Sequence, residues 1–210
     1  MLSFQQVKKS YGDQLVLDVP SLQLDNGIYW LKGHNGSGKT TLLRMIAGLI
    51  PFKGDFFYHS LSLKKSPVTY RRRIGWSEAE PLFPEFITGE ELIRLYTSVR
   101  NVDGKEAGEL LDLFRMNDYV QNAVRTYSSG MQKKLAIVLA LIGNPSLILL
   151  DEPLITLDAE SSEKLVALVN EWHVARKINF LLSSHVEPDP QMTRGHRLLK
   201  VDNHTVVAAA

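Results

Sequence analysis

The chain has 210 residues, a formal net charge of +1, 44% hydrophobic residues and no cysteine. The length fits one domain with a sizeable core, or one domain plus a small subdomain, and the near-neutral charge favours neither nucleic-acid binding nor disorder. The absence of cysteine excludes a disulfide scaffold and a thiolate metal site. The longest apolar run, Leu135 to Gly143, is shorter than the roughly 20 residues that a membrane-spanning helix needs, so we expect no such helix.

Strand-like and helix-like segments alternate along the chain, which predicts an α/β fold. From the N-terminus, the residue patterns predict strands at 2–9 and 28–31, a helix at 40–49, a strand at 54–60, and helices at 90–100 and 105–116. They continue with a helix capped by Ser128 or Ser129 that ends at 143, a buried strand at 146–151, a helix at 159–176, a buried strand at 178–185 and a hairpin at 197–207. The acidic, proline-broken stretch 74–90 has neither periodicity and is expected to be a loop. We expect a single domain, residues 1–210, with a helical insertion at about 84–145.

A glycine-rich segment, GHNGSGKT at 33–40, matches the phosphate-loop pattern G-x-x-x-x-G-K-[ST] in full, between an apolar strand and a helix. Exposed loop N–H groups and a helix N-terminus both attract the oxygens of a nucleotide triphosphate. Lys39 is expected on the outer phosphates, and the Thr40 hydroxyl is expected to ligate Mg²⁺. The competing interpretation is a chance glycine-rich turn. The predicted nucleotide-binding residues here are Gly33, His34, Asn35, Gly36, Ser37, Gly38, Lys39, Thr40 and Thr41.

An acidic pair, Asp151 and Glu152, follows the buried strand at 146–151. Ligands of an open α/β sheet bind at the carboxyl ends of its strands. Asp151 is therefore expected to hold Mg²⁺, directly or through water, and Glu152 is expected to polarise the attacking water. The alternative is a strand-end carboxylate that caps the next turn.

Four further features accompany these motifs in a fixed order: Tyr11, YSSGMQKK at 127–134, PLITLD at 153–158 and SSH at 183–185. Together they resemble the ATP-binding cassette of ABC transporters, over about residues 2–205. YSSGMQ is similar to the family signature LSGGQ, and it discriminates because kinases and GTPases have no counterpart. It also looks like the YSxGM variant of cassettes from ABC-2-type exporters. The resemblance implies a P-loop NTPase with a mostly parallel core sheet, an N-terminal antiparallel β subdomain and an inserted helical subdomain.

The resemblance also implies that two cassettes close head to tail and trap two ATP molecules. Each ATP would lie between the phosphate loop of one subunit and the signature of the other. His185 would bond the γ-phosphate and hold the attacking water, although a lone strand-end histidine is more often structural. The implied signature contacts are Ser128, Ser129, Gly130 and Met131, for which an ordinary helix N-cap is the alternative.

Two more residues have roles that the resemblance implies. Asp158 would lie in the loop that contacts the partner cassette, and it is also placed to cap the helix from Ala159. Tyr11 would stack on adenine, although an aromatic residue before a turn usually serves packing.

The sequence departs from the family pattern at several positions. Ser129 stands where glycine is usual, Met131 stands where glutamine is usual, and PLITLD replaces PTSGLD. The family usually places a glutamine at the end of a segment such as IGYLPQ. An ungapped alignment with IGWSEA puts Ala79 at that position, whereas a shift of one residue puts Glu78 or Glu80 there.

These features predict an ATP-hydrolysing subunit that powers an ABC transporter. We expect a separate membrane permease, a second identical or different ABC ATPase subunit, and no nucleic acid partner. The expected location is cytoplasmic, peripheral on the inner face of the cell membrane through the permease. The helical region at 84–100 is expected to face the permease, with a solvated surface helix as the alternative. Two rival functions are a soluble ABC-type ATPase that acts on ribosomes or DNA, and a degenerate ATP-binding clamp.

Overall fold

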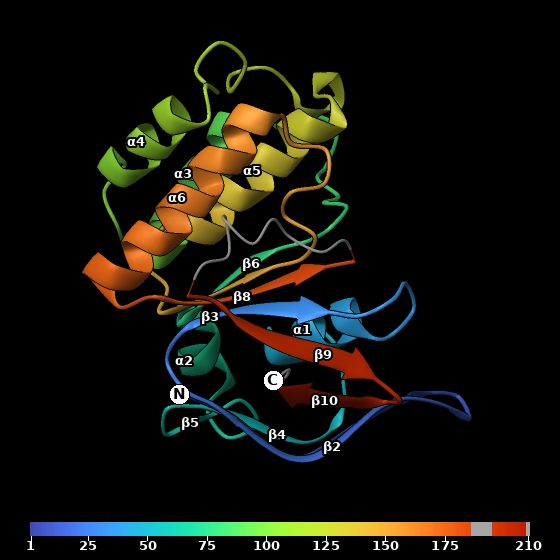
Figure 1. The fold of residues 1–210 in the computed structure, drawn as a ribbon. Coiled ribbons are helices and arrows are strands. Elements are labelled where there is room, and N and C mark those ends of the chain that lie inside the picture. The colour runs from blue at the N-terminus through green and yellow to red at the C-terminus, as the bar shows by residue number, and fades with distance from the viewer. Residues whose placement is uncertain (186–194, 209–210) are drawn as a thin grey trace.

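An antiparallel sheet forms the N-terminal part of the computed structural model, which describes residues 1–185 and 195–208 (Figure 1). Its strand order is β2-β1-β4-β5. The strands are β1 (Leu2–Tyr11), β2 (Gln14–Leu24), β4 (Lys53–Tyr58) and β5 (Leu61–Ser62). β2 is not among the predicted strands, although Leu17 and Val19 are buried in alternation with more exposed neighbours, as in a half-buried strand.

The core sheet has six strands in the order β10-β9-β3-β8-β7-β6. All neighbouring strands are parallel except the closing hairpin of β9 and β10. The strands are β3 (Ile28–Lys32), β6 (Ile74–Ser77), β7 (Leu147–Leu150), β8 (Asn179–Ser184), β9 (Arg197–Asp202) and β10 (Thr205–Ala208). Every residue of β7 is buried, as expected for a parallel strand that is covered on both faces.

Helices cover both faces of the core sheet (Figure 1). They are α1 (Lys39–Ile46), α2 (Pro67–Arg72), α3 (Gly89–Arg100), α4 (Lys105–Leu113), α5 (Ser129–Leu141) and α6 (Ala159–Arg176), with a 3₁₀ turn at Val124–Thr126. Neighbouring residues of β3 pack on opposite sides: Trp30 joins the core under α3 to α6, and Leu31 joins the core with α1 and the antiparallel sheet. This alternation follows from the two-residue period of a strand.

These elements confirm the predicted fold class. The expected loop at 74–90 is wrong at both ends, because Ile74–Ser77 forms β6 and α3 begins at Gly89. β6 pairs with β7 and packs against α5, so both of its faces are largely buried and no alternation marks it in the sequence.

Among the helices of the described residues, none is long and apolar enough to span a bilayer.

Candidate nucleotide-binding and catalytic site

The phosphate loop, the acidic pair, His185 and the loop after β6 meet at one edge of the core sheet. β3, β8, β7 and β6 are parallel neighbours, so their carboxyl ends lie side by side. β3 leads into the phosphate loop, β8 into His185, β7 into Asp151, and β6 into Glu78. The sheet topology thus gathers segments that are far apart in the sequence, at the place where open α/β sheets bind ligands.

The phosphate loop ends at Gly38, which has φ +105° and provides no side-chain cap for α1. A Cβ at Gly38 would also lie 3.2 Å from Val16 of β2. Glycine therefore lets the loop turn directly against β2 and leaves the first N–H groups of α1 without a capping side chain. Such a helix start attracts anions.

The Lys39 ammonium is buried inside the phosphate loop. Its Nζ donates hydrogen bonds to the carbonyl oxygens of Gly33, at 2.8 Å, and His34, at 3.3 Å. The same atom lies 3.7 Å from Glu152 Oε1. The loop thus holds a cation that can exchange these carbonyl oxygens for phosphate oxygens.

Asp151 is fully buried, and its two carboxylate oxygens have different surroundings. Oδ1 accepts a hydrogen bond from Ser183 Oγ at 2.5 Å, and this hydroxyl in turn accepts from the Glu152 N–H at 2.9 Å. Oδ2 is buried without a hydrogen-bond partner. Ser183 is a site residue that the sequence reasoning missed, although it begins the SSH motif.

The unpaired Oδ2 of Asp151 fits a cation, because a buried carboxylate oxygen without a partner is unfavourable. Mg²⁺ is usually held by one or two protein oxygens, with waters and substrate phosphates completing its shell. Asp151 and the Thr40 hydroxyl at the start of α1 suit this requirement. Within residues 1–185 and 195–208, no cluster of three His, Cys, Asp or Glu side chains could hold a metal by itself.

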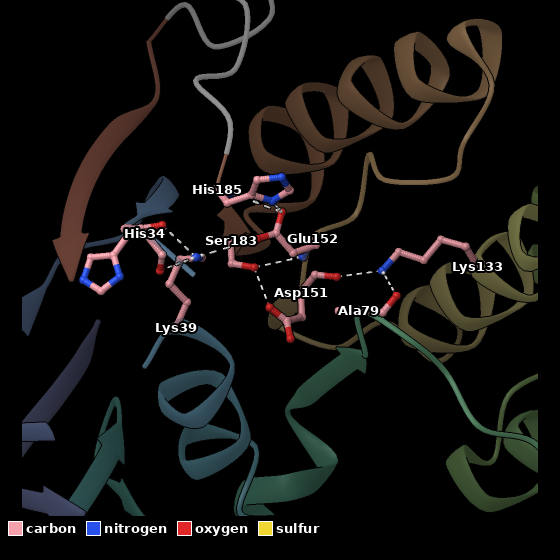
Figure 2. A network of polar contacts seen from close by, with 9 residues as sticks. His34, Lys39, Ala79, Lys133, Asp151, Glu152, Ser183 and His185 are labelled. Atoms are coloured by element: carbon pink, nitrogen blue, oxygen red, sulfur yellow. Dashed lines mark hydrogen bonds and ion pairs between the residues drawn. The ribbon is translucent and has the colours of Figure 1, made fainter. Parts of the chain in front are cut away.

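Glu152 and His185, which follow two neighbouring strands of the core sheet, are in direct contact. Glu152 Oε2 lies 3.0 Å from His185 Nδ1 and 3.3 Å from the His185 backbone N–H. Figure 2 shows the acidic pair between Lys39 on one side and Lys133 on the other. Glu152 has φ +45°, a left-handed conformation that is uncommon for a residue with a side chain and is often found at functional sites.

The signature forms a second cluster, apart from the phosphate loop. Ser128 caps α5, with its Oγ accepting from the Met131 N–H at 3.2 Å, so the N-cap interpretation holds for this hydroxyl. Ser129 is exposed, and a Cβ on Gly130 would lie 2.7 Å from the Thr156 carbonyl oxygen. Glycine is therefore required where α5 meets the 153–158 segment. Among the described residues, no hydrogen bond or ion pair joins this cluster to the phosphate loop of the same chain.

Asp158 is the N-cap of α6, as the sequence suggests. Its carboxylate accepts from the Ser161 N–H at 2.8 Å and pairs with Lys134 Nζ of α5 at 2.8 Å. The contact with Lys134 and the hydrogen bonds from Ser161 lower the pKa of Asp158 below its ordinary value. Asp158 thus joins the signature helix to α6.

We expect Asp158→Ala to lower the free energy of unfolding by about 1 kcal/mol, because the cap of α6 is lost. The exposed ion pair with Lys134 adds little. For a chain of this length, about 1 kcal/mol corresponds to a fall in Tm of roughly 2–4 °C. Calorimetry would check this value against Glu109→Ala, which removes an exposed carboxylate from α4. Equal Tm values for the two variants would contradict the capping role.

Tyr11 ends β1 with its side chain 52% exposed. The Lys9 ammonium lies 4.5 Å from the ring centroid. Val16, on the following strand of the same hairpin, lies against Gly38 of the phosphate loop. The hairpin therefore borders the phosphate loop, and Tyr11 has ring surface available for stacking.

The three candidates for the usual glutamine position differ in their surroundings. The Glu78 carboxylate is bound by the Arg44 guanidinium of α1, with Oε1 2.8 Å from Nε and 2.7 Å from Nη2. Glu80 is exposed. Ala79 presents its backbone carbonyl to Lys133 Nζ, at 3.2 Å. The contact with Arg44 thus holds the Glu78 carboxylate on α1.

Lys133 is the second residue that sequence reasoning missed. It lies on α5 with no exposed surface, and burial lowers its pKa to about 8. The sequence carries one signal for it: the two lysines of QKK lead directly into an apolar run at 135–142, and a helix that is apolar on all sides is buried. In the structure it is Lys133 that faces inward.

The fold and the contacts of Lys39, Asp151, Glu152 and His185 define a P-loop nucleotide-binding domain of the ABC type. The sequence profile of the family described as "ABC transporter" matches residues 17–155. The chain therefore belongs to the ABC transporter family.

Individual relatives agree with this assignment. The chain is 35% identical over 195 residues to the ABC transporter ATP-binding protein NatA of Bacillus subtilis, covering 90% of this chain and 78% of that protein. It is 32% identical over 181 residues to the bacitracin transport ATP-binding protein BcrA of Bacillus licheniformis, covering 85% of this chain and 59% of the relative. For several other relatives, the chain spans only 50% to 63% of their length.

A solved structure described as the ATP-binding subunit of an ABC transporter superposes on the whole chain. The TM-score is 0.87 with 28% sequence identity, and the match covers 90% of that structure. A dimeric ATP-binding cassette in a post-hydrolysis state with ADP and Pi has the same fold, with a TM-score of 0.83 and 23% identity over 98% of this chain and 96% of its own.

Proposed function

We propose that this chain binds and hydrolyses ATP and that it powers an ABC transporter as a subunit separate from the membrane permease. The observation that supports this most directly is the convergence of Lys39, Glu152 and His185 at the carboxyl edge of the sheet. A cation for phosphates, a carboxylate base and an adjacent histidine are the groups that phosphoryl transfer to water requires.

The residues of this chain would divide the work as follows. Lys39 would exchange its loop carbonyls for the outer phosphates, while the N–H groups at the start of α1 bind the remaining oxygens. Glu152 would orient water and accept its proton, and His185 would hold the γ-phosphate. Thr40 and Asp151 would hold Mg²⁺, which when bound neutralises phosphate charge.

A second cassette would complete the site. Ser128, Ser129, Gly130 and Met131 lie at the start of α5, next to the segment that contains Asp158. We propose that they approach the ATP of a partner cassette, which can be identical or different. Tyr11 would stack on the adenine of the ATP that its own phosphate loop binds.

The membrane permease would dock beside the loop that follows β6. Leu82 and Phe86 are 92% and 84% exposed, which is unusual for large apolar side chains. A groove of about 160 Å³ is lined by Leu82 together with Trp76, Phe83 and Tyr96. We propose that a permease helix covers this surface and holds the chain at the inner face of the membrane.

We also propose that the chain is a single domain in which the helical part at about 84–145 is an insertion.

To test this proposal, the tagged chain would be purified from solubilised membranes of its source cells, with Phe86→Ser as the variant. We expect a multi-span membrane protein to co-purify with the wild-type chain and to be several-fold depleted with Phe86→Ser, because apolar anchors dominate such interfaces. Val174→Ser is the matched control, since Val174 is an exposed apolar residue on α6.

Each rival function has its own outcome in this experiment. Recovery of ribosomal proteins or DNA in place of a membrane protein would favour a soluble ABC-type ATPase. Recovery of the permease without any ATP-dependent phosphate release by the complex would favour a degenerate clamp.

A further inference from the structure

Lys133 joins three segments that surround the proposed ATP site. Its Nζ donates to the carbonyl oxygens of Glu78, at 2.7 Å, Ala79, at 3.2 Å, and Asp151, at 2.6 Å. Lys133 itself lies one helical turn after Ser129 of the signature. One buried ammonium therefore connects the signature helix, the loop after β6 and the end of β7 (Figure 2).

The three contacts suit a charged lysine in number and in kind. An ammonium has three N–H donors and no acceptor, and three carbonyl oxygens receive them. Buried charges are usually paired with an opposite charge, whereas these three acceptors are neutral backbone oxygens. Lys133 therefore holds the backbones of the connected segments. The carboxylates of Glu78 and Asp151 are bound by other residues, Arg44 and Ser183.

Asp151 is held from two sides as a result. Ser183 binds its carboxylate Oδ1, and Lys133 binds its backbone carbonyl. Ala79 has only a methyl group as its side chain, so only its backbone can hydrogen-bond, and its carbonyl joins that of Glu78 in accepting from Lys133 of α5. A displacement of α5 would therefore shift the backbones of both Ala79 and Asp151, because Lys133 Nζ is bonded to both.

We propose that Lys133 is a positioning residue that couples the signature helix to Asp151 and to the loop at 78–79. The inference rests on the proposed function, because it concerns the same ATP site. In this chain, the hydrogen bonds from the Lys133 ammonium to backbone carbonyls would link the conformation of the ATP site to that of the loop at 78–79. The three N–H donors of Lys133 bind backbone carbonyls, so its proposed effect is on the arrangement of the groups that meet ATP.

The test uses Lys133→Met, which keeps the length and the apolar stem but removes all three donors. Lys133→Gln keeps two donors and is the milder variant. Lys105→Met is the matched control, because Lys105 is an exposed lysine of α4. Hydrogen–deuterium exchange with and without Mg-ATP would be measured on the full chain, together with ATP affinity and turnover.

In the wild-type chain, Mg-ATP is expected to slow exchange at 33–41 and at 78–82. In Lys133→Met, we expect the protection at 33–41 to remain and the protection at 78–82 to be lost. Turnover should fall by about 10- to 100-fold, as for residues that orient metal ligands, while ATP affinity changes by less than about threefold. Lys133→Gln should lie between, and Lys105→Met should match the wild type.

Retained protection at 78–82 with wild-type turnover in Lys133→Met would overturn the inference. So would loss of ATP binding at 33–41, or failure of both Lys133 variants to fold, since either result makes Lys133 a residue of general stability. A wild-type chain that binds no ATP would contradict the proposed function itself, and the inference would fall with it.

Discussion

Replacing Glu152 with glutamine is expected to slow ATP turnover by at least about 100-fold, because a general base contributes on the order of 10²–10⁴ to the rate. Glutamine has the same shape, so its side-chain oxygen can still accept from the His185 backbone N–H. It cannot accept a proton, and it removes a negative charge from the region of the γ-phosphate. ATP should therefore remain bound, and a cassette dimer that contains uncleaved ATP should accumulate.

Two measurements check this prediction. Phosphate release gives turnover, and size-exclusion chromatography with Mg-ATP gives the fraction of dimer. Glu163→Gln is the control, because it makes the same chemical change at an exposed position of α6. Turnover of Glu152→Gln at the wild-type rate would show that another group serves as the base.

The second large effect is expected for Lys39→Ala, which should weaken ATP binding on the order of 100-fold or more. Hydrogen bonds to charged groups contribute about 1.5–3 kcal/mol each, so losing the ammonium from the outer phosphates accounts for this magnitude. The variant also loses the bonds from Nζ to the carbonyls of Gly33 and His34. The empty loop should therefore become less ordered as well.

Titration calorimetry with Mg-ATP would measure the affinity, and circular dichroism would show that the fold is intact. Lys105→Ala is a suitable control, because this exposed lysine lies on α4, away from the phosphate loop. Tight ATP binding by a folded Lys39→Ala chain would contradict the assignment of the phosphate-binding cation.

Local sequence patterns were sufficient to predict the phosphate loop and the bounds of several helices and strands. The phosphate loop requires glycines and a lysine at fixed spacing, so eight consecutive residues identify it. The helix from Ala159 to Arg176 has the predicted bounds because Asp158 caps it and Lys177 ends it in a left-handed conformation. In contrast, β6 was missed, since a four-residue strand buried on both faces has no period of its own.

The sequence by itself determined the fold class and the family, and it predicted the candidate site residues, because these depend on motifs whose chemistry is local. Only the tertiary structure decided which side chains meet across long separations. It placed Ser183 on the Asp151 carboxylate, directed Glu78 to Arg44, and brought Lys133 to the carbonyl of Ala79. These contacts depend on how strands and helices pack, and no spacing along the chain encodes them.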